Sequence, residues 1–214
     1  RGAPRAAAQR PAQLRALRRA HHEAMSEGDR ELANIIVRNT ARMNETVSSV
    51  LELSRRTPPN FEPIDIDEWI PLVISEYKEA ISHDAILSFT GSCPSPIMAD
   101  KKQLKRVLDN LIDNALRHSE AKTGARTAQL HVSQSDNHHV CCIDVIDDGE
   151  GVPESAQARL FEPFFTTRPE GTGLGLYLCK ELCESNGAEI SYRRTHEGRS
   201  SFQLSLRMQS GDAQ

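Results

Sequence analysis

A long periodic stretch of apolar positions dominates the first quarter of the chain. Between Asp29 and Arg56, large apolar residues recur at steps of three and four, which predicts an amphipathic helix with one apolar stripe. Asp29 follows Gly28 and is expected to cap this helix, and the prolines of "TPPNFEP", residues 57–63, end it. A stripe of this kind has to pack on another helix, so we expect a homodimer. The stripe consists of Leu32, Ile35, Ile36, Met43, Val47, Val50, Leu51 and Leu53.

The residues before this helix carry a much weaker pattern. Residues 1–28 are rich in Arg and Ala, and only Leu14, Leu17 and His21 suggest a short helix between Pro11 and Met25. We therefore divide the chain into a poorly patterned segment (1–28), a long helix with its linker (29–58) and a globular domain (59–210).

The globular domain alternates between helical and strand periodicity. We expect a short extended piece and a helix in "IDIDEWIPLVISEYKEAI", a strand in "AILSFTGS", and a helix over residues 100–118 that Asp100 begins. Paired strands are predicted for "AQLHVSQS" and "HHVCCIDVID", and a closing hairpin for "EISYRRT" and "SSFQLSLRM". Between the two pairs lies a loop rich in Gly, Pro and Thr, residues 148–172, and then a helix over 173–186. Long loops inside compact domains are usually functional.

Composition and charge narrow the function classes. The net charge of −4 argues against a nucleic-acid binder, whose affinity rests on clustered Lys and Arg. No apolar run approaches the roughly 18 residues that cross a bilayer, and no signal peptide is visible. We expect a soluble, cytoplasmic piece of a longer protein, which at full length is a membrane-bound sensor. The five cysteines lack zinc-ligand spacing, and we interpret them as reduced, buried thiols.

Paired asparagines form the first candidate site. In "NLIDNALRHS", Asn110 and Asn114 are four residues apart, so on a helix their amides point the same way. An amide oxygen is a neutral hard ligand that suits Mg²⁺ already holding water and phosphate oxygens. Arg117, one turn further on, is placed to meet a phosphate. Taken alone, the same pattern also describes a helix with a polar, solvent-exposed face.

Two glycine-rich segments follow. In "DVIDDGEGVP", Gly149 and Gly151 allow a sharp turn after a strand, and a carboxylate at its base can accept an amino hydrogen from a purine. An acidic hairpin turn explains that segment equally well. In "GTGLGL", three glycines precede a helix whose first amides are partly positive, which suits a phosphate. It is neither a Walker loop nor a dinucleotide fingerprint, since the required spacings are missing.

In this order, the segments resemble the ATP-binding domain of sensor histidine kinases over residues 62–208. "NLIDNALRH" is similar to the N box of that family, "DDGEGV" to its G1 box, "LFEPFF" to its F box and "GTGLGL" to its G2 box. The resemblance is strongest to the nitrogen-regulation type, and within it to the sensor kinases of type IV pilus systems. It implies an α+β fold, in which a two-layer α/β sandwich shared with gyrases and chaperones follows residues 29–58 as the second helix of a dimerisation hairpin.

The resemblance also implies roles for individual residues. Asp147 would accept the adenine amino group, and Asn114 would hold Mg²⁺ with Asn110 alongside. The rings of Phe161, Phe164 and Phe165 would anchor a mobile lid. The implied ATP-binding residues are Asn110, Asn114, Arg117, Asp147, Gly149, Gly151, Phe161, Thr166, Thr167, Gly171, Thr172, Gly173, Leu174 and Gly175.

Asn110 and the first histidines decide between related functions. Related hydrolytic ATPases have a Glu where Asn110 stands, and an amide cannot accept the proton of water. This favours transfer to a histidine, and then to an Asp of a response regulator of the sigma-54 activator type. His22-Glu23 matches a phosphoacceptor pair only superficially, since "AMSEGD" follows it. The alternative is an ATP-binding module without its own acceptor, acting as a phosphatase or docking partner.

Overall fold

The computed structural model describes residues 26–54, 58–80, 84–135, 139–168 and 171–208. The chain divides into two compact units, Arg1–Ser48 and Ser49–Gln214, which are treated separately below. In the described residues, no helix combines the length and hydrophobicity that crossing a membrane requires.

Helix α2 (Glu27–Ser54) is the main element of the first unit, and its 28 residues confirm the predicted amphipathic helix. Its start differs from the prediction. The Ser26 hydroxyl accepts the Asp29 amide at 3.2 Å, and the Asp29 carboxylate accepts the Ser26 amide at 3.3 Å. The cap is therefore Ser26, and the expectation for Asp29 was wrong, because Asp29 is the acidic partner in a capping box. The exposed apolar side chains of α2 include Leu32, Ile35, Ile36, Val37, Met43, Val47 and Leu51.

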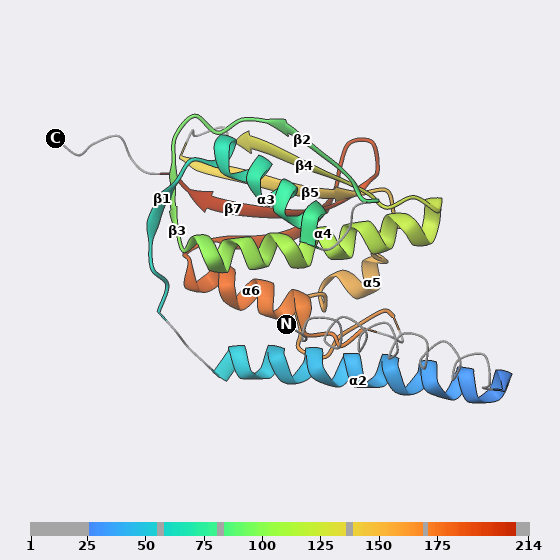
Figure 1. The fold of residues 1–214 in the computed structure, drawn as a ribbon. Helices are drawn as coiled ribbons and strands as arrows, with labels where there is room; N and C mark the ends of the chain where they lie inside the picture. Colours follow the sequence, from blue (N-terminus) through green and yellow to red (C-terminus); the bar gives the residue numbers. More distant parts are fainter. Residues whose placement is uncertain (1–25, 55–57, 81–83, 136–138, 169–170, 209–214) are drawn as a thin grey trace, which may run out of the picture. The chain divides into compact units, whose positions relative to one another are not determined.

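The second unit is an α+β sandwich of two layers, as expected. Its five-stranded sheet has the order β2-β4-β5-β7-β6, and only β2 and β4 are parallel. Helices α3, α4 and α6 cover one face of it, and β1 pairs with β3 in a separate small sheet (Figure 1). The elements are β1 (Glu62–Ile64), α3 (Ile66–Ala80), β2 (Ile86–Gly91), β3 (Ile97–Ala99), α4 (Lys101–Thr123), β4 (Thr127–Gln134), β5 (Val140–Asp147), α5 (Glu154–Gln157), α6 (Gly175–Ser185), β6 (Glu189–Arg194) and β7 (Ser200–Arg207).

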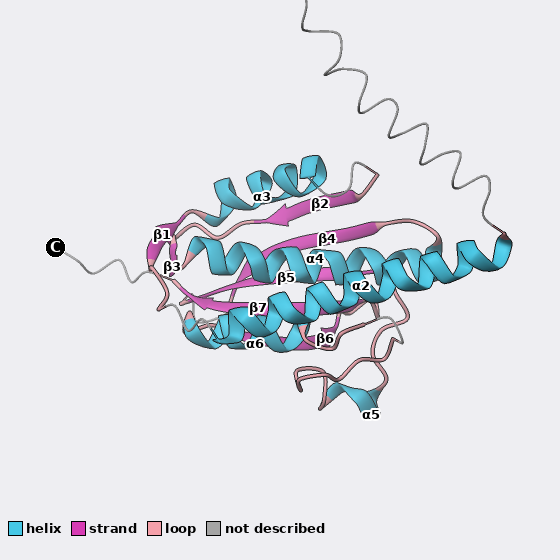
Figure 2. Ribbon diagram, turned by 60° about the horizontal axis from the view of Figure 1, so that its bottom comes forward, coloured by secondary structure: helices cyan, strands magenta, loops and turns pink. Residues whose placement is uncertain are grey.

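The predicted elements are present, and their ends follow local signals. Asp100 caps α4 by accepting the Lys102 and Gln103 amides, as its position predicted. The helix continues five residues past the predicted end, to Thr123, and Gly124 ends it with a φ of 77°. The expected long loop contains one short helix, α5, in the connection between β5 and α6 (Figure 2).

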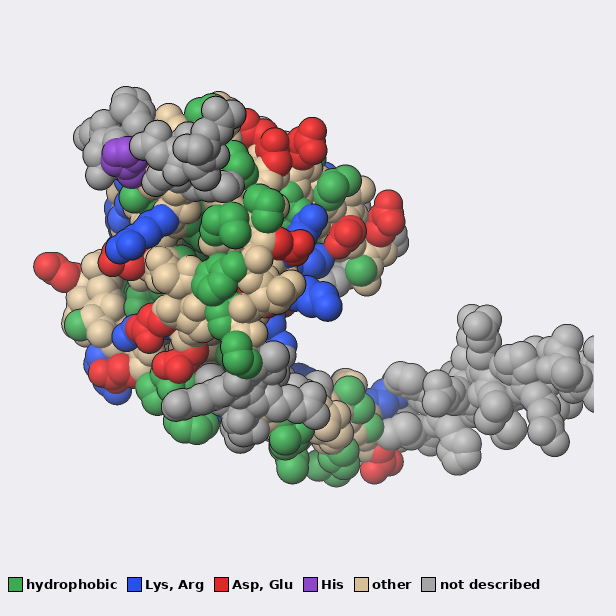
Figure 3. Space-filling view, turned by 90° about the vertical axis from the view of Figure 1, so that its left-hand side faces the viewer, with side chains coloured by type: hydrophobic (Ala, Val, Ile, Leu, Met, Phe, Trp, Pro, Cys, Tyr) green, Lys and Arg blue, Asp and Glu red, His purple; other side chains and the backbone are tan. Residues whose placement is uncertain are grey.

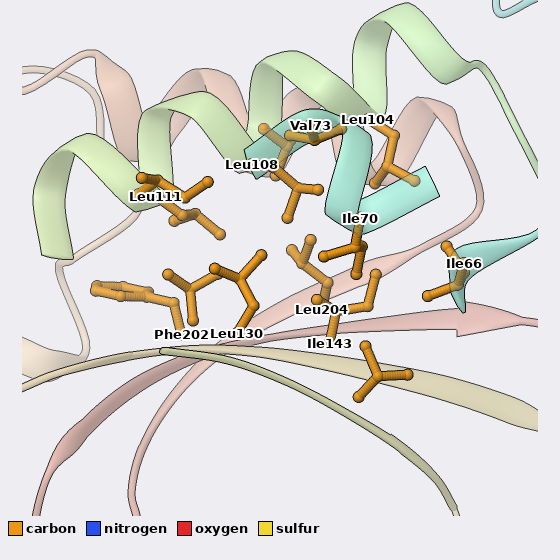
Figure 4. Close-up of a cluster of buried hydrophobic side chains, with 14 of the residues drawn as sticks. Ile66, Ile70, Val73, Leu104, Leu108, Leu111, Leu130, Ile143, Phe202 and Leu204 are labelled. Atoms are coloured by element: carbon orange, nitrogen blue, oxygen red, sulfur yellow. The ribbon is translucent and has the colours of Figure 1, made fainter. Parts of the chain in front are cut away.

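The core lies between the helices and the sheet. Side chains from α3 and α4 point toward alternating residues of the strands (Figure 4). On β5, Ile143 and Val145 face this layer and are at most 1% exposed. All five cysteines are free and four are buried, and burial raises the pKa of Cys183 to about 12. These observations agree with the interpretation of the cysteines as reduced, buried thiols.

An ion pair between a buried carboxylate and a half-exposed arginine lies on the opposite face of the sheet. The Asp144 carboxylate is 1% exposed and binds the Arg193 guanidinium through two contacts of 2.7 and 3.0 Å. The Ser201 hydroxyl at 2.6 Å and the Gln203 amide at 3.0 Å also donate to it. Because the donors come from β6 and β7, this carboxylate ties β5 to the two strands that follow it in the sheet.

Figure 3 shows the end of the second unit at which β1 and β3 lie, turned toward the viewer. Phe61, beside β1, is 49% exposed and Met98, on β3, is 38% exposed. Acidic and basic side chains are interspersed over this face, which is the usual arrangement of a solvent-exposed surface.

Candidate nucleotide-binding site

Helices α4 and α6 bring the first and third sequence motifs together. Asn110 and Asn114 lie one turn apart on α4 and are both partly buried. The Asn110 amide nitrogen donates to the Arg106 carbonyl at 3.2 Å. A Cβ placed on Gly175, the first residue of α6, would lie 3.4 Å from Asn110 Oδ1. The start of α6 therefore lies next to Asn110, the first of the paired asparagines.

The acidic turn, residues 147–152, begins at the last residue of β5 and packs closely against α4 at Gly149. Asp147 is 4% exposed, and its Oδ1 accepts the Gly149 amide at 2.8 Å. A Cβ on Gly149 would lie 2.6 Å from that oxygen and 2.9 Å from the His118 Cβ. The glycine is thus required by the chain's own packing, beside α4. Among the described residues, only the Gly149 amide hydrogen-bonds to this carboxylate.

Burial perturbs the acid–base chemistry of Asp147. The pKa of its carboxyl is raised from 3.8 to about 6, and burial is the largest cause. The Gly149 amide, Lys122 and Arg194 lower the pKa, while Asp148 raises it. Above about pH 6 the turn therefore presents a charged acceptor with few partners of its own. Such a group suits a hydrogen-bond donor on a ligand, for example the amino group of adenine.

The loop between α5 and α6 is anchored by two of its three phenylalanines. The Phe161 ring packs edge-on against Phe202, with centroids 6.3 Å apart. The Arg159 guanidinium lies 4.6 Å above the Phe165 ring. Phe164, however, is 66% exposed and has a φ of 64°. The expectation that Phe164 also anchors this loop is therefore not met in this structure.

The glycine-rich segment before α6 packs closely against the same loop. A Cβ on Gly171 would lie 2.4 Å from Thr166 Oγ1, and one on Gly173 would lie 2.4 Å from the Phe164 carbonyl carbon. Gly173 also has a φ of 70°, which disfavours any side chain. The two glycines therefore fix the path of the loop into α6.

Helix α6 begins without a side-chain cap at Leu174. The three longer described helices differ in this respect, since Ser26, Asp65 and Asp100 cap α2, α3 and α4. An uncapped helix start of this length is a favourable place for an anion, because its amides and dipole are left without a negative partner. The site therefore offers a hydrogen-bond acceptor at Asp147 and an anion-binding end at α6.

The remaining predicted residues occupy the surroundings of this site. Thr166 Oγ1 accepts the Arg168 amide at 3.1 Å, Thr172 Oγ1 accepts the Leu174 amide at 3.4 Å, and Thr167 is exposed. The pKa of His118 is lowered by burial first, and then by the nearby charges of Arg168 and Arg117.

Arg117 is already paired within α4. Its Nη2 lies 2.6 Å from Asp113 Oδ2, and Tyr77 donates its hydroxyl hydrogen to the same carboxylate. A phosphate would have to compete with Asp113 for this guanidinium. Among the described residues no three His, Cys, Asp or Glu side chains are grouped to hold a metal, so the metal prediction rests on Asn114. His22, the candidate phosphoacceptor, lies outside the described residues.

Comparison with known protein families identifies the family of the domain that carries these features. Residues 99–210, which include both asparagines, the acidic turn and the start of α6, match the model of the histidine kinase-, DNA gyrase B-, and HSP90-like ATPases. The chain belongs to this ATPase family. The resemblance inferred from the four motifs is thus confirmed at the level of the family.

Named relatives of this ATPase domain are sensor histidine kinases. The chain is 40% identical over 185 residues to the sensor protein kinase PilS of Pseudomonas aeruginosa, covering 86% of this chain and 35% of that protein. It is 29% identical over 198 residues to the sensory histidine kinase/phosphatase NtrB of Rhodobacter capsulatus, covering 85% of this chain and 54% of that protein. The chain therefore spans only part of the length of either relative.

Solved structures share the fold of the ATPase domain. The histidine kinase ThkA in complex with the response regulator protein TrrA is 25% identical, with a TM-score of 0.68 over 92% of this chain and 57% of that one. Full-length ShkA in complex with AMPPNP is 22% identical, with a TM-score of 0.67 over 87% of this chain and 41% of that one. The likeness to ShkA bears on the fold alone.

Proposed function

We propose that this chain is the kinase core of a two-component sensor histidine kinase. It binds ATP with Mg²⁺, supports phosphorylation of a histidine and passes the phosphoryl group to an Asp of a response regulator. The observation that carries the proposal is the contact between Asn110 and the uncapped start of α6. It places a candidate phosphate site beside the helix that carries Asn114, the candidate metal ligand.

The residues of the pocket fit the parts of ATP. The Asp147 carboxylate, with a single partner, is suited to accept the amino group of adenine. The start of α6 and the glycines before it are suited to the phosphates. Asn114, with Asn110 alongside, would hold Mg²⁺ against the phosphates, and the ion would neutralise charge as the phosphoryl group transfers. Phosphoryl transfer depends mainly on positioning and charge neutralisation, which a preformed pocket supplies.

Asn110 supports a kinase over a hydrolase. A general base for water needs a group that accepts a proton, and a carboxamide cannot do so at neutral pH. Its amide nitrogen is already bonded to the Arg106 carbonyl, so its oxygen is directed toward α6 as an acceptor. The pocket would then keep ATP intact until a nucleophile arrives on another segment.

The proposed partner is a response regulator. The relative NtrB is named a histidine kinase/phosphatase, and the ThkA structure is a complex with a response regulator. Similarity to PilS and NtrB supports a regulator of the sigma-54 activator type and a role in type IV pilus control. In the full-length protein this core would lie on the cytoplasmic side of a membrane-bound sensor.

An ATP-binding module without its own phosphoacceptor is the second candidate. The candidate acceptor, His22, matches a phosphoacceptor pair only superficially because "AMSEGD" follows His22-Glu23, which favours this alternative. Such a module would act as a phosphatase or docking partner. The exposed apolar residues of α2 support a homodimer under either proposal, because the same stripe is available on a second copy.

The test is incubation of the chain with Mg²⁺ and γ-labelled ATP, with nucleotide binding measured in parallel. Acid-labile label on the protein, lost in His22→Gln and kept in His196→Gln, would establish a kinase with its own acceptor. ATP binding without label would favour the module that lacks an acceptor. Steady release of phosphate without label, unchanged in Asn110→Ala, would point to hydrolysis instead. A chain that binds no ATP would overturn both proposals.

A further inference from the structure

The acidic turn is held in place by side chains from two other segments, β6 and α4. Arg194 Nη2, at the end of β6, donates to the Glu150 carbonyl at 2.8 Å. The Tyr192 hydroxyl accepts the Val152 amide at 3.0 Å. From α4, Lys122 donates to the Gly149 carbonyl at 3.3 Å and Ser119 accepts the Asp148 amide at 3.0 Å. Four residues of the turn thus have a backbone group fixed from outside.

Two arginines of the β6–β7 hairpin hold the turn from two sides. Arg194 uses its other nitrogen, Nη1, to donate to the Gly198 carbonyl at 2.8 Å, so one guanidinium joins the hairpin tip to the acidic turn. Arg199 lies 3.5 Å from the Asp148 carboxylate, which also accepts the Thr127 hydroxyl at 2.7 Å. The tip of the hairpin and the acidic turn are therefore joined at two points.

Arg194 also explains one of the predicted nucleotide-site glycines. A Cβ on Gly151 would lie 2.3 Å from Arg194 Nη2 and 2.6 Å from its Cζ, and the three nearest atoms all belong to Arg194. Gly151 has a φ of 82°, which favours glycine independently. The space that a side chain would occupy at this position is filled by a guanidinium of the chain itself.

We propose that Arg194 and Tyr192 are positioning residues for adenine, which fix the turn so that Asp147 meets the base. The inference rests on the proposed function, because it concerns the same pocket. Neither side chain needs to touch the nucleotide. Each acts through a backbone group of the turn, and a turn displaced by a fraction of an ångström would misplace the carboxylate relative to the purine edge.

Two adjacent arginines on β6 provide a matched test. Arg194→Gln removes the link to the turn, whereas Arg193→Gln removes the ion pair with buried Asp144 on the opposite face of the sheet. Affinity for ADP and for GDP would be measured for each folded variant of the 214-residue chain, together with its thermal midpoint. Both changes remove one guanidinium from the same strand, so general effects of charge loss are matched.

The two variants should behave in opposite ways. Arg194→Gln is expected to weaken ADP binding about tenfold and to reduce the preference for ADP over GDP, since a charged hydrogen bond to the turn is lost. Arg193→Gln is expected to lower the thermal midpoint more and to leave both affinities within about twofold, because its partner lies outside the pocket. Arg194→Lys, which can make only one of the two carbonyl contacts, should lie between Arg194→Gln and the unchanged chain.

Three outcomes would overturn the inference. One is unchanged affinity and unchanged base preference in Arg194→Gln, and another is an equal loss of affinity in both glutamine variants. The third applies if Arg194→Gln does not fold. Tyr192→Phe, which removes a single hydroxyl, would then leave the preference for ADP over GDP unchanged. Failure of the unchanged chain to bind ADP would instead defeat the proposed function, so the two failures can be told apart.

Discussion

Replacing Asp147 by Asn should make the nucleotide-free protein more stable while it weakens nucleotide binding. The carboxylate is 4% exposed, and burial raises its pKa to about 6. Its charge is therefore costly in the folded chain when no ligand is present. Asn keeps an oxygen that accepts the Gly149 amide and removes the charge.

The magnitude follows from the pKa shift. A change from 3.8 to about 6 corresponds to about 3 kcal/mol, at about 1.4 kcal/mol per unit. Because the folded pKa is raised, protonated Asp147 contributes stability that is fully present below pH 3.8 and is lost as pH rises through about 6. The Asp147→Asn variant has no charge to gain at this position, so it does not lose this stability as pH rises. Its advantage in the free energy of unfolding should therefore reach about 3 kcal/mol at pH 7.5 and narrow toward pH 4.

The assay is urea unfolding of both proteins without nucleotide at pH 7.5 and 4.5, with ADP affinity measured at pH 7.5. Asp148→Asn is the control, since it removes the next carboxylate and its ion pair with Arg199 without relieving a buried charge. It should give no stabilisation. An Asp147→Asn protein that is less stable than its parent at pH 7.5, or a difference that does not change with pH, would refute the reasoning. Unchanged ADP affinity would refute the role of the carboxylate.

Three further changes test other parts of the molecule. Gly173→Ala places a Cβ 2.4 Å from the Phe164 carbonyl carbon at a φ of 70°, so ATP affinity should fall more than about tenfold by fluorescence titration; unchanged affinity would contradict this. Leu108→Ala empties a 0% exposed position and should cost about 2–5 kcal/mol in urea unfolding; a loss below about 1 kcal/mol would contradict the packing. Val47→Glu should weaken a dimer in sedimentation experiments, and a monomeric unchanged chain would end that idea.

Element types in the second unit were predictable because their signals are local. Asp100 gave the start of α4 correctly, since an N-cap needs only a side chain and the amides two and three residues later. The end of α4 was placed too early, because polar residues after His118 look like a loop although they continue the helix to Gly124. The cap of α2 was misplaced for a similar reason. Ser26 and Asp29 form a reciprocal pair, in which Asp29 alone carries the more visible acidic signal.

The nucleotide-site residues were predicted as separate motifs, and the supports of the site were not. Asn110, Asp147 and Gly175 carry local patterns that a glycine-rich helix start or an acidic turn makes visible. Arg194 and Tyr192 carry none, because they bind backbone groups of a turn that lies 44 and 40 residues earlier in the chain. A backbone carbonyl accepts from any donor, so no residue pairing in the sequence reveals such a contact. The resemblance assigned one role to all three phenylalanines of the loop and did not separate the exposed Phe164 from Phe161 and Phe165.

Two places where this fold departs from ordinary stability rules both adjoin α4, and their chemistry is complementary to a nucleotide. Asp147 is a buried carboxylate with one described hydrogen-bond partner, and the 11-residue helix α6 begins without a side-chain cap. The carboxylate has a single donor, the Gly149 amide, and the start of α6 has no anionic side chain as a cap. A ligand that complements both therefore carries an amino group at one end and a negative charge at the other. A dianion would be repelled at Asp147, and a cation would be disfavoured at α6. Sites that break local rules without internal compensation are expected to be functional, because a ligand supplies the missing partners. Adenine at one end and phosphates at the other meet this requirement.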